Sequence, residues 1–335
     1  MTEKLRSILG MQAECTRNEP DSDFLSVFDE PVRKFLKKQI EDSGHDSREI
    51  SPVFDIVIQA EKKKIPKNIL SYPPGIVLAR IQEQALATIR SILSQDSKMK
   101  KLRERIKSYE SIFLVGAGIS FESGIPLTRI LQDVLCFSGA NSYEELTKNQ
   151  KKCKIFKQKF GEICNKKKHC KSHLLLVTNF PEYIKEIICL NWDNLIERCG
   201  ITLSPPRKIN KINEDIPVNT QNNLWKFHGD VDNIKNDNVK GEGGWIFPHE
   251  EGYVFNCFTD YVKKSGISNS LFTFVIVGYS EKEKEIVNKI IEIFEKEPPR
   301  PTFRIGFDLS CLNDEKYIFG PSDYILPRIM PITLG

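Results

Sequence analysis

The stretch that most constrains the fold of this chain is residues 111–129, SIFLVGAGISFESGIPLTR. Residues 112–115 form a short apolar run of the kind that becomes a strand buried on both faces of a sheet. The run leads directly into Gly116 and Gly118, where the missing Cβ atoms let the backbone turn sharply and approach a ligand closely. Two serines follow where the next helix is expected to start, and a helix N-terminus attracts anions. The order of strand, glycine turn and helix is typical of a dinucleotide pyrophosphate site.

The glycine spacing alone leaves a second interpretation open. After Gly116 and Gly118 the third glycine is Gly124, which does not fall at the regular dinucleotide-binding interval. A glycine turn of this kind is also compatible with a purely structural role, so the rest of the chain has to decide.

Three further apolar runs end in polar residues in the same way. Residues 186–190 lead into NWDN, residues 224–227 into HGD, and residues 271–277 into GYS. Because the carboxyl ends of parallel strands meet at one edge of a sheet, these polar groups are expected to gather there. The sequence therefore predicts an α/β fold, a Rossmann-like parallel sheet with flanking helices, preceded by an N-terminal helical region.

Composition bounds the class of protein. The chain has 335 residues, 40% hydrophobic and 28% charged, as in ordinary globular proteins. A net charge of +4 implies no general attraction to nucleic acid or membranes. No apolar run approaches the roughly 20 residues that span a bilayer. The N-terminus lacks the apolar core of a secretory signal, and the nine cysteines are odd in number and scattered. We therefore expect a cytoplasmic protein with reduced thiols.

We predict two domains, with the boundary at residues 107 and 108. Residues 1–107 are expected to be mostly helical, with one long helix over residues 76–106, and they carry no recognisable chemistry. They are either a layer packed on the catalytic domain or a docking or oligomerisation module. Within residues 108–335, the proline-, asparagine- and lysine-rich stretch 202–222 is expected to be a loop. The last 35 residues hold short extended pieces and many prolines, which the sequence does not place.

One region holds two other candidate sites. Nine lysines lie between Lys151 and Lys171 against a single acid, Glu162, and such a run could contact phosphates. With little aromatic interleaving, a solvated helix face is the favoured interpretation, and nucleic acid is not expected as a direct partner. The potential zinc ligands in this region have the spacing of no common zinc module, so no metal is expected: Cys153, Cys164, His169, Cys170 and His173.

The motifs taken together resemble the sirtuin catalytic domain, over roughly residues 108–295. They occur in the family's order and at plausible intervals. The cofactor-loop motif is matched by Gly116, Ala117, Gly118, Ser120, Gly124, Ile125, Pro126 and Arg129, the Asn-x-Asp motif by Asn191 and Asp193, the catalytic His-Gly by His228, and the later Gly-x-Ser by Gly278 and Ser280.

The chain departs from the protein-deacylating sirtuins in ways that bear on activity. Those enzymes carry a zinc ribbon of two Cys-x-x-Cys pairs after the catalytic histidine, whereas only Cys257 lies between His228 and Gly278 here. Thr128 replaces an aromatic residue of the cofactor loop, and Leu190 replaces the glutamine before Asn-x-Asp. Because the zinc module helps to form the acyl-lysine cleft, these departures disfavour deacylation.

The chain is therefore most similar to the zinc-ribbon-lacking, sirtuin-like domains of prokaryotic antiphage systems, which hydrolyse NAD⁺ to nicotinamide and ADP-ribose. The resemblance implies NAD⁺ as substrate, and as partners a second copy of the chain or a defence protein such as an AAA-type ATPase. The alternatives are an NAD-dependent deacylase or ADP-ribosyltransferase, and a non-catalytic sensor of NAD or ADP-ribose.

The resemblance also implies a role for each site residue. Asn191 would hold the ribose or the attacking water, and Asp193 would contact the nicotinamide amide. His228 would act as the base, a role suited to a side chain that titrates near neutrality. The glycine loop and Ser280 would bind the phosphates and the adenosine half.

Overall fold

A computed structural model of the chain divides it into two compact units, residues 1–97 with 307–312 and residues 98–306 with 313–335. The predicted boundary at residues 107 and 108 stays a prediction. The structure describes residues 30–42, 79, 82–83, 86–87, 89–91, 93–120, 123–125, 138–139, 145, 149–212, 223–228, 252–267, 270–278, 284–294, 301–306, 311 and 314–332.

The long helix predicted over residues 76–106 is wrong as a single element. Described residues between 79 and 93 are helical, but Ser94 and Gln95 interrupt the helix before α5 begins at Asp96. The Ser94 hydroxyl donates to the Ser91 carbonyl (3.2 Å), which a continuing helix would have used. Such side-chain bonds compete with the helical ladder. In the same unit, α2 (Glu30–Asp42) buries Leu36 and Ile40, which lie on one face of the helix.

The second unit is built on a seven-stranded sheet in the order β3-β4-β2-β1-β5-β6-β7, in which every pairing is parallel. This confirms the predicted Rossmann-like fold class. The strands are β1 (Glu110–Val115), β2 (Ile184–Cys189), β3 (Asn210–Ile212), β4 (Asn223–Lys226), β5 (Phe272–Val277), β6 (Thr302–Gly306) and β7 (Tyr317–Phe319).

Four of these strands, β1, β2, β4 and β5, correspond to the apolar runs read from the sequence. The sequence missed β3, and it expected extended pieces in the last 35 residues without placing β6 and β7. The expectation that residues 202–222 form only a loop is wrong, because β3 lies within that stretch and pairs with β4. β3 and β7 have three residues each, too few for an apolar period to stand out, and β6 alternates half-buried with buried residues in place of an unbroken apolar run.

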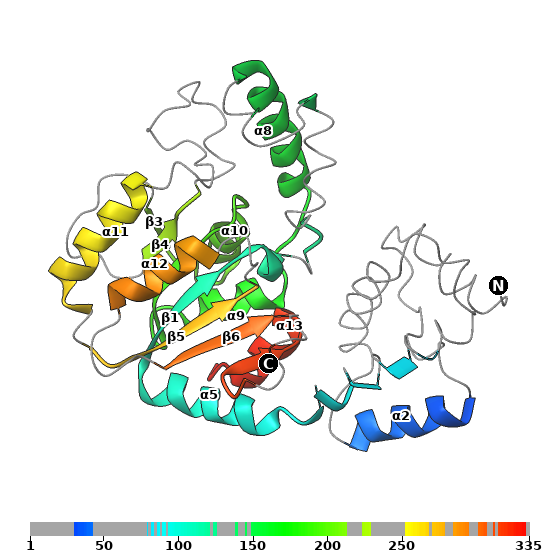
Figure 1. Cartoon of the computed structure of the whole chain (residues 1–335). Helices are drawn as coiled ribbons and strands as arrows, with labels where there is room; N and C mark the ends of the chain where they lie inside the picture. The colour runs from blue at the N-terminus through cyan, green and yellow to red at the C-terminus, as the bar shows by residue number, and fades with distance from the viewer. Residues whose placement is uncertain are drawn as a thin grey trace. The chain divides into compact units, whose positions relative to one another are not determined.

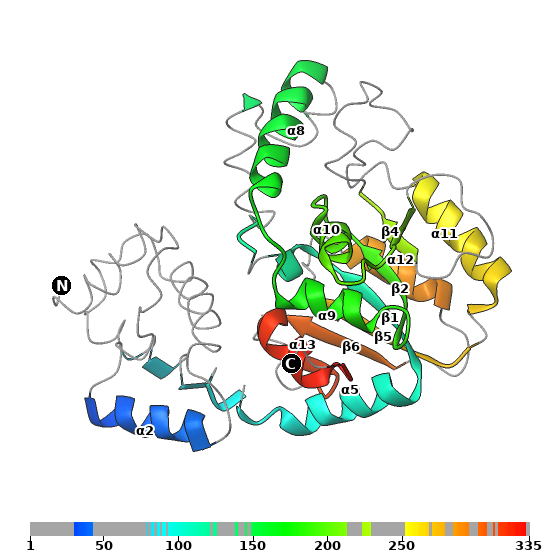
Figure 2. The ribbon, with the colours of Figure 1, turned by 180° about the vertical axis from the view of Figure 1, so that it is seen from behind.

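Helices cover both faces of the sheet. Figure 1 shows α11 and α12 across one face, and Figure 2 shows α9, α10 and α13 across the other. The bounds of this unit's helices are α5 (Asp96–Ser108), the 3₁₀ helix η3 (Ala117–Ser120), α8 (Gln150–Asn165), α9 (Lys171–Asn179), α10 (Leu195–Thr202), α11 (Gly252–Ser265), α12 (Lys284–Phe294) and α13 (Ser322–Ile329). The last 35 residues, which the sequence left unassigned, thus supply two strands and a helix.

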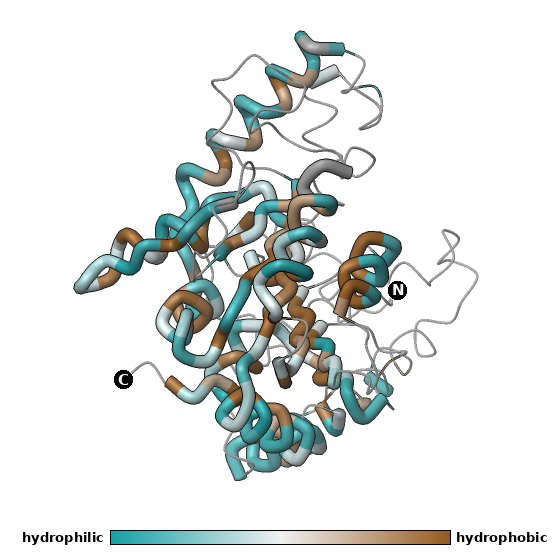
Figure 3. The backbone as a smooth tube through the Cα atoms, turned by 90° about the vertical axis from the view of Figure 1, so that its left-hand side faces the viewer, coloured by the Kyte–Doolittle hydropathy of each residue, from teal (hydrophilic) through white to brown (hydrophobic). Residues whose placement is uncertain are grey.

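One hydrophobic core cluster lies between the sheet and the two helices α11 and α12. Trp225 on β4 contacts Phe258 of α11 edge to face, with ring centroids 4.8 Å apart, and Phe294 of α12 contacts Phe258 and Phe272 in the same way. Figure 3 shows how hydrophobic and hydrophilic residues are distributed along the described backbone. Among the helices that the structure describes, none is both long and apolar enough to cross a bilayer.

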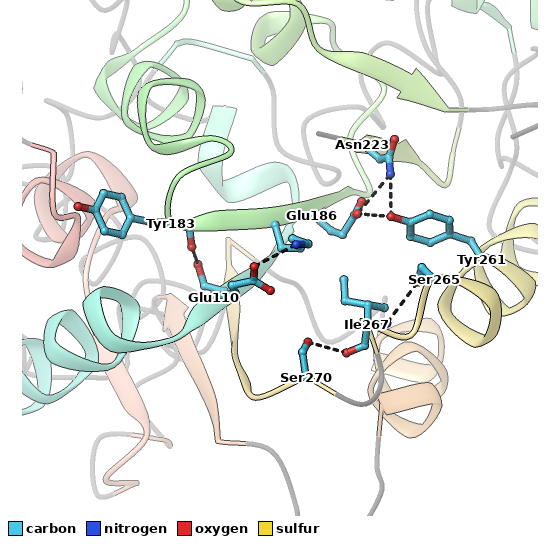
Figure 4. Close-up of polar contacts among 10 residues, drawn as sticks. Glu110, Tyr183, Glu186, Asn223, Tyr261, Ser265, Ile267 and Ser270 are labelled. Atoms are coloured by element: carbon cyan, nitrogen blue, oxygen red, sulfur yellow. Dashed lines mark hydrogen bonds and ion pairs between the residues drawn. The ribbon is translucent and has the colours of Figure 1, made fainter. Parts of the chain in front are cut away.

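A buried polar network interrupts this core. Glu186 of β2 is 1% exposed and accepts hydrogen bonds from the Tyr261 hydroxyl (2.6 Å), the Trp225 indole N–H (2.8 Å) and the Asn223 amide (3.2 Å). Figure 4 shows the Tyr261 and Asn223 side chains meeting the carboxylate from α11 and β4. Burial outweighs these donors and raises the pKa of Glu186 to about 7. The network links α11 to the sheet.

The topology places a potential ligand site at one edge of the sheet. β1 lies between β2 and β5, so the chain leaves β1 on one side and later returns on its other side. This reversal is a topological switch point, and open α/β sheets bind ligands in the crevice at the carboxyl ends of the strands beside it.

Candidate functional site

Two glycines meet back to back at the switch point. The Gly116 N–H donates to the Val277 carbonyl and the Gly118 N–H to the Gly278 carbonyl, both at 2.9 Å. A Cβ on Gly118 would lie 2.5 Å from the Gly278 Cα, and Gly278 has φ +67°. Neither position accepts a side chain without a backbone shift. The close contact between the ends of β1 and β5 therefore requires glycine at both Gly118 and Gly278.

The rest of the predicted cofactor loop is only partly described. Ala117 and Ser120 lie in η3, so the chain turns here as a 3₁₀ helix. Gly124 follows with φ 78°, and Ile125 is buried and donates its N–H to the Ser120 carbonyl (3.2 Å). Pro126, Arg129 and Ser280 lie outside the described residues, as does the helix expected to follow the glycines.

Asn191 joins this loop from the end of β2. Its amide nitrogen donates to the Gly116 carbonyl (3.1 Å) and to the Ser120 hydroxyl oxygen (3.2 Å). A carbonyl can only accept, so the NH₂ group, and not the oxygen, must face Gly116. Both amide hydrogens are thereby occupied, and Oδ1 is the atom of this side chain that remains for a ligand.

Asp193 is nearly buried and serves two purposes. Its Oδ1 accepts the Leu195 N–H (3.1 Å), which caps the start of α10. Its main-chain carbonyl accepts a hydrogen bond from the Lys226 ammonium (2.5 Å). The second carboxylate oxygen, Oδ2, makes no hydrogen bond to the described residues.

Lys226 is a residue that the sequence analysis missed. This last residue of β4 is fully buried, and its ammonium lies 3.8 Å from the Glu197 carboxylate in the first turn of α10. Its contact with Asp193 ties the turn after β2 to β4. A lysine within the otherwise apolar run 224–227 was the available signal, since buried charges need partners.

His228 is the second residue after β4, the neighbour of β2 in the sheet. It is almost buried, and the preceding residue, Phe227, donates its N–H to the Cys189 carbonyl (3.1 Å). Asn191, Asp193 and His228 therefore come from the ends of two paired strands. The structure brings Asn191 into contact with the glycine loop through Gly116 and Ser120.

A helix outside the sheet also reaches this turn. Trp192, between the two predicted catalytic residues, contacts Phe156 and Phe160 of α8 edge to face, with ring centroids 6.0 and 5.9 Å apart. The Arg198 guanidinium of α10 donates to the Cys164 carbonyl near the end of α8 (3.1 Å). α8, which extends away from the sheet in Figure 1, is thus anchored on the turn through its apolar face. Of its lysines, Lys151, Lys154 and Lys159 are exposed, whereas Lys157 is buried.

The cysteines and histidines considered for zinc separate into two groups. Cys153 and Cys164 are buried in the packing of α8, whereas Cys170 and His173 lie together at the start of α9. Among the described residues, no group of three or more histidine, cysteine or acidic side chains is arranged to hold a metal ion. Cys189 and Cys199, interpreted from sequence as core residues, are buried.

No family model matches the sequence, and no curated protein matches it. Solved structures with similar folds include a Sir2 homologue in complex with NAD (19% identity, TM-score 0.47, covering 69% of this chain and 92% of that one). A Sir2 homologue variant with ADP-ribose (16%, 0.49, 69% and 96%) and Sir2 bound to an acetylated peptide (15%, 0.42, 69% and 97%) are also similar. Likeness at this level carries no conclusion about the activity of this chain, which its own residues have to support.

Proposed function

We propose that this chain is an NAD⁺ hydrolase that cleaves the nicotinamide–ribose bond and releases nicotinamide and ADP-ribose. The observation that carries the proposal is the orientation of the Asn191 amide. Gly116 and Ser120 occupy both of its hydrogens, so a hydrogen-bond acceptor, Oδ1, is held at the switch point of the sheet. The paired glycines Gly118 and Gly278 beside it bring the ends of β1 and β5 into close contact at this point of the sheet.

Cleavage of the nicotinamide–ribose bond needs little general-acid catalysis. The nicotinamide ring of NAD⁺ is cationic, so the electron pair of the breaking bond returns to the ring nitrogen and a neutral group leaves. The demands are to orient the ribose, to stabilise its developing positive charge and to place a water. Asn191 Oδ1 accepts a hydrogen bond from the water or a ribose hydroxyl, and Asp193 Oδ2 accepts one from the nicotinamide carboxamide.

His228 acts as the general base. As the water oxygen bonds to the anomeric carbon, the imidazole takes the water proton and passes it to solvent. Its place after β4, next to β2, the strand that precedes Asn191, supports this role. The Lys226 contact with the Asp193 carbonyl holds the two strand ends together.

Hydrolysis is favoured over deacylation by the cysteine content. A single cysteine, Cys257, lies between His228 and Gly278, too few for a four-thiolate zinc ribbon. The sequence resemblance further suggests that the activity serves antiviral defence, in a homo-oligomer or with a partner such as an AAA-type ATPase.

The experiment that tests the proposal is nicotinamide release from NAD⁺ by the purified full chain at several protein concentrations. His228→Ala and Asn191→Asp should lower the rate by about 10²- to 10⁴-fold, because each removes a group that contacts the reacting atoms. Glu285→Gln on the exposed face of α12 is the matched control and should keep the wild-type rate. Thermal unfolding confirms that each variant is folded.

Two results would overturn this function. If the His228→Ala protein retains wild-type turnover, His228 is not the general base. A wild-type protein that binds NAD⁺ by calorimetry at every concentration but releases no nicotinamide, with or without co-purified partners, would identify a sensor instead.

A further inference from the structure

We infer that His173 and Cys170 are positioning residues, which fix the orientation of the Asn191 side chain through Ser120. The inference rests on the proposed function, because it assigns these residues to the reaction in which Asn191 takes part. The four side chains form one chain of contacts that runs from the start of α9, through η3, to the end of β2.

The direction of each hydrogen bond follows from the atoms involved. The Cys170 backbone N–H lies 3.3 Å from His173 Nδ1, and a backbone N–H can only donate. Nδ1 is therefore an acceptor. A neutral imidazole carries one ring proton, so that proton sits on Nε2. Nε2 lies 3.2 Å from the Ser120 hydroxyl oxygen and donates to it.

The imidazole remains neutral in this environment. His173 is completely buried, and burial lowers its pKa to about 4. Of the charged groups around it, Asp193 and Asp323 favour the protonated form, while Lys226 and His169 oppose it. A protonated ring would turn its Nδ1–H toward the Cys170 N–H, and two donors would then face each other.

The ring orientation of His173 affects Asn191 through the hydroxyl oxygen of Ser120. The Ser120 oxygen has two acceptor sites, and His173 Nε2–H and the Asn191 amide fill both. His173 thereby fixes where the hydroxyl oxygen lies. That oxygen and the Gly116 carbonyl together hold both Asn191 hydrogens, which leaves Oδ1 as the acceptor.

Cys170 secures the same arrangement from the other side. Its thiol lies 3.4 Å from the carbonyl of Ile119, the residue before Ser120, and 3.0 Å from His173 Nδ1, and both of these atoms are acceptors for its proton. Burial raises the pKa of the thiol to about 12, so it keeps the proton that either bond needs. The same residue is the N-cap of α9 and closes a capping box with His173. The Cys-x-x-His pair therefore orients the loop and is neither a nucleophile nor a metal ligand.

Two NMR measurements on the full chain test the orientation without relying on activity. In ¹⁵N-histidine-labelled protein, with the signal assigned by its loss in His173→Gln, we expect the proton on Nε2 from pH 8 to pH 5.5. In ¹⁵N-asparagine-labelled protein, with the signal assigned by Asn191→Asp, we expect both side-chain hydrogens to be protected from exchange. A proton on Nδ1, or a protonated ring at pH 6, would overturn the inference.

Variants test the link to the reaction. His173→Leu should lose the exchange protection of the Asn191 amide and lower kcat by about 10- to 100-fold, as expected for a misplaced reacting group, with little change in the Kd of NAD⁺. His173→Gln restores a donor toward Ser120 and should recover most of both. His169→Gln, in the half-buried turn just before α9, is the matched control and should match wild type.

The outcomes separate the two proposals. If His173→Leu keeps a protected Asn191 amide and wild-type kcat, the positioning role is wrong even though hydrolysis stands. If the wild-type protein releases no nicotinamide, the proposed function fails, while the ring proton and the amide protection still decide the orientation.

Discussion

Replacing Glu186 by glutamine should change how the stability of this protein depends on pH. The carboxyl group is buried between β2 and α11 and receives hydrogen bonds from Trp225, Tyr261 and Asn223. Burial raises its pKa from 4.5 to about 7. Glutamine has nearly the same shape but does not titrate, so Glu186→Gln isolates the ionisation from the packing.

The sign follows from proton binding. Between pH 4.5 and 7 the folded carboxyl group holds a proton that the unfolded one has lost, so the free energy of unfolding falls as pH rises through this window. This rise in the pKa of Glu186 from 4.5 to about 7 corresponds to about 2–3 kcal/mol of unfolding free energy lost by the wild-type protein between pH 5 and pH 8. The unfolding free energy of Glu186→Gln does not fall in this way, because glutamine does not titrate. Relative to wild type, the variant should therefore be about 2–3 kcal/mol more stable at pH 8 than it is at pH 5.

The assay compares the two proteins by urea unfolding, followed by tryptophan fluorescence, at pH 5 and pH 8. The difference between them is the informative quantity for two reasons. The amide of glutamine meets the Trp225 N–H, which lowers stability by about 1–3 kcal/mol at every pH and therefore cancels. His173, with its pKa lowered to about 4, makes stability rise from about pH 4 to pH 6.5 in both proteins.

Glu285→Gln is the control. This carboxylate is exposed and paired with Lys289 (2.7 Å), which lowers its pKa, so removing it should have a small effect of opposite sign. If the unfolding free energies of Glu186→Gln and wild type differ by the same amount at both pH values, within about 0.5 kcal/mol, then Glu186 is not protonated in the fold and the argument from burial is refuted.

Three further predictions concern the site. Gly118→Ala places a Cβ 2.5 Å from the Gly278 Cα and should lower stability by about 1–3 kcal/mol and weaken NAD⁺ binding in calorimetry; unchanged affinity would contradict the close contact. Trp192→Ala removes two aromatic contacts with α8 and should lower the unfolding free energy by about 1–3 kcal/mol, with faster hydrogen exchange along α8; unaltered exchange there would show that the helix is held elsewhere. Cys189 is buried and its pKa is raised to about 12, so iodoacetamide at pH 8 should label the half-buried Cys257 before Cys189. Equal labelling of these two cysteines, measured by mass spectrometry, would contradict the burial of Cys189.

The network around Asn191 shows where sequence reasoning stops. The Asn-x-Asp pair was identified because it follows an apolar strand and matches a motif. His173 was noted only as one of several possible zinc ligands. Nothing local distinguishes it, because its importance comes from contacts with Ser120 and Cys170, one of them 53 positions away in the chain.

Lys226 and Glu186 also show what sequence can and cannot predict. Each is a charged residue within an otherwise apolar strand, and that pattern signals a buried polar group. Which partners each residue meets depends on which strands and helices are neighbours. The lysine meets Glu197 and Asp193, and the carboxylate meets Tyr261.

The sequence by itself determined the class of fold, because four apolar runs with polar ends and helices between them have few packing solutions other than a parallel sheet. It also placed the glycine turn at the end of a strand, since these are local properties of backbone and side chain. Only the tertiary structure decided that β5 returns beside β1, so that Gly278 meets Gly118, and that α9 starts beside η3. The order of strands and the layering of helices arise from burying side chains that are distant in sequence, and no local period records them.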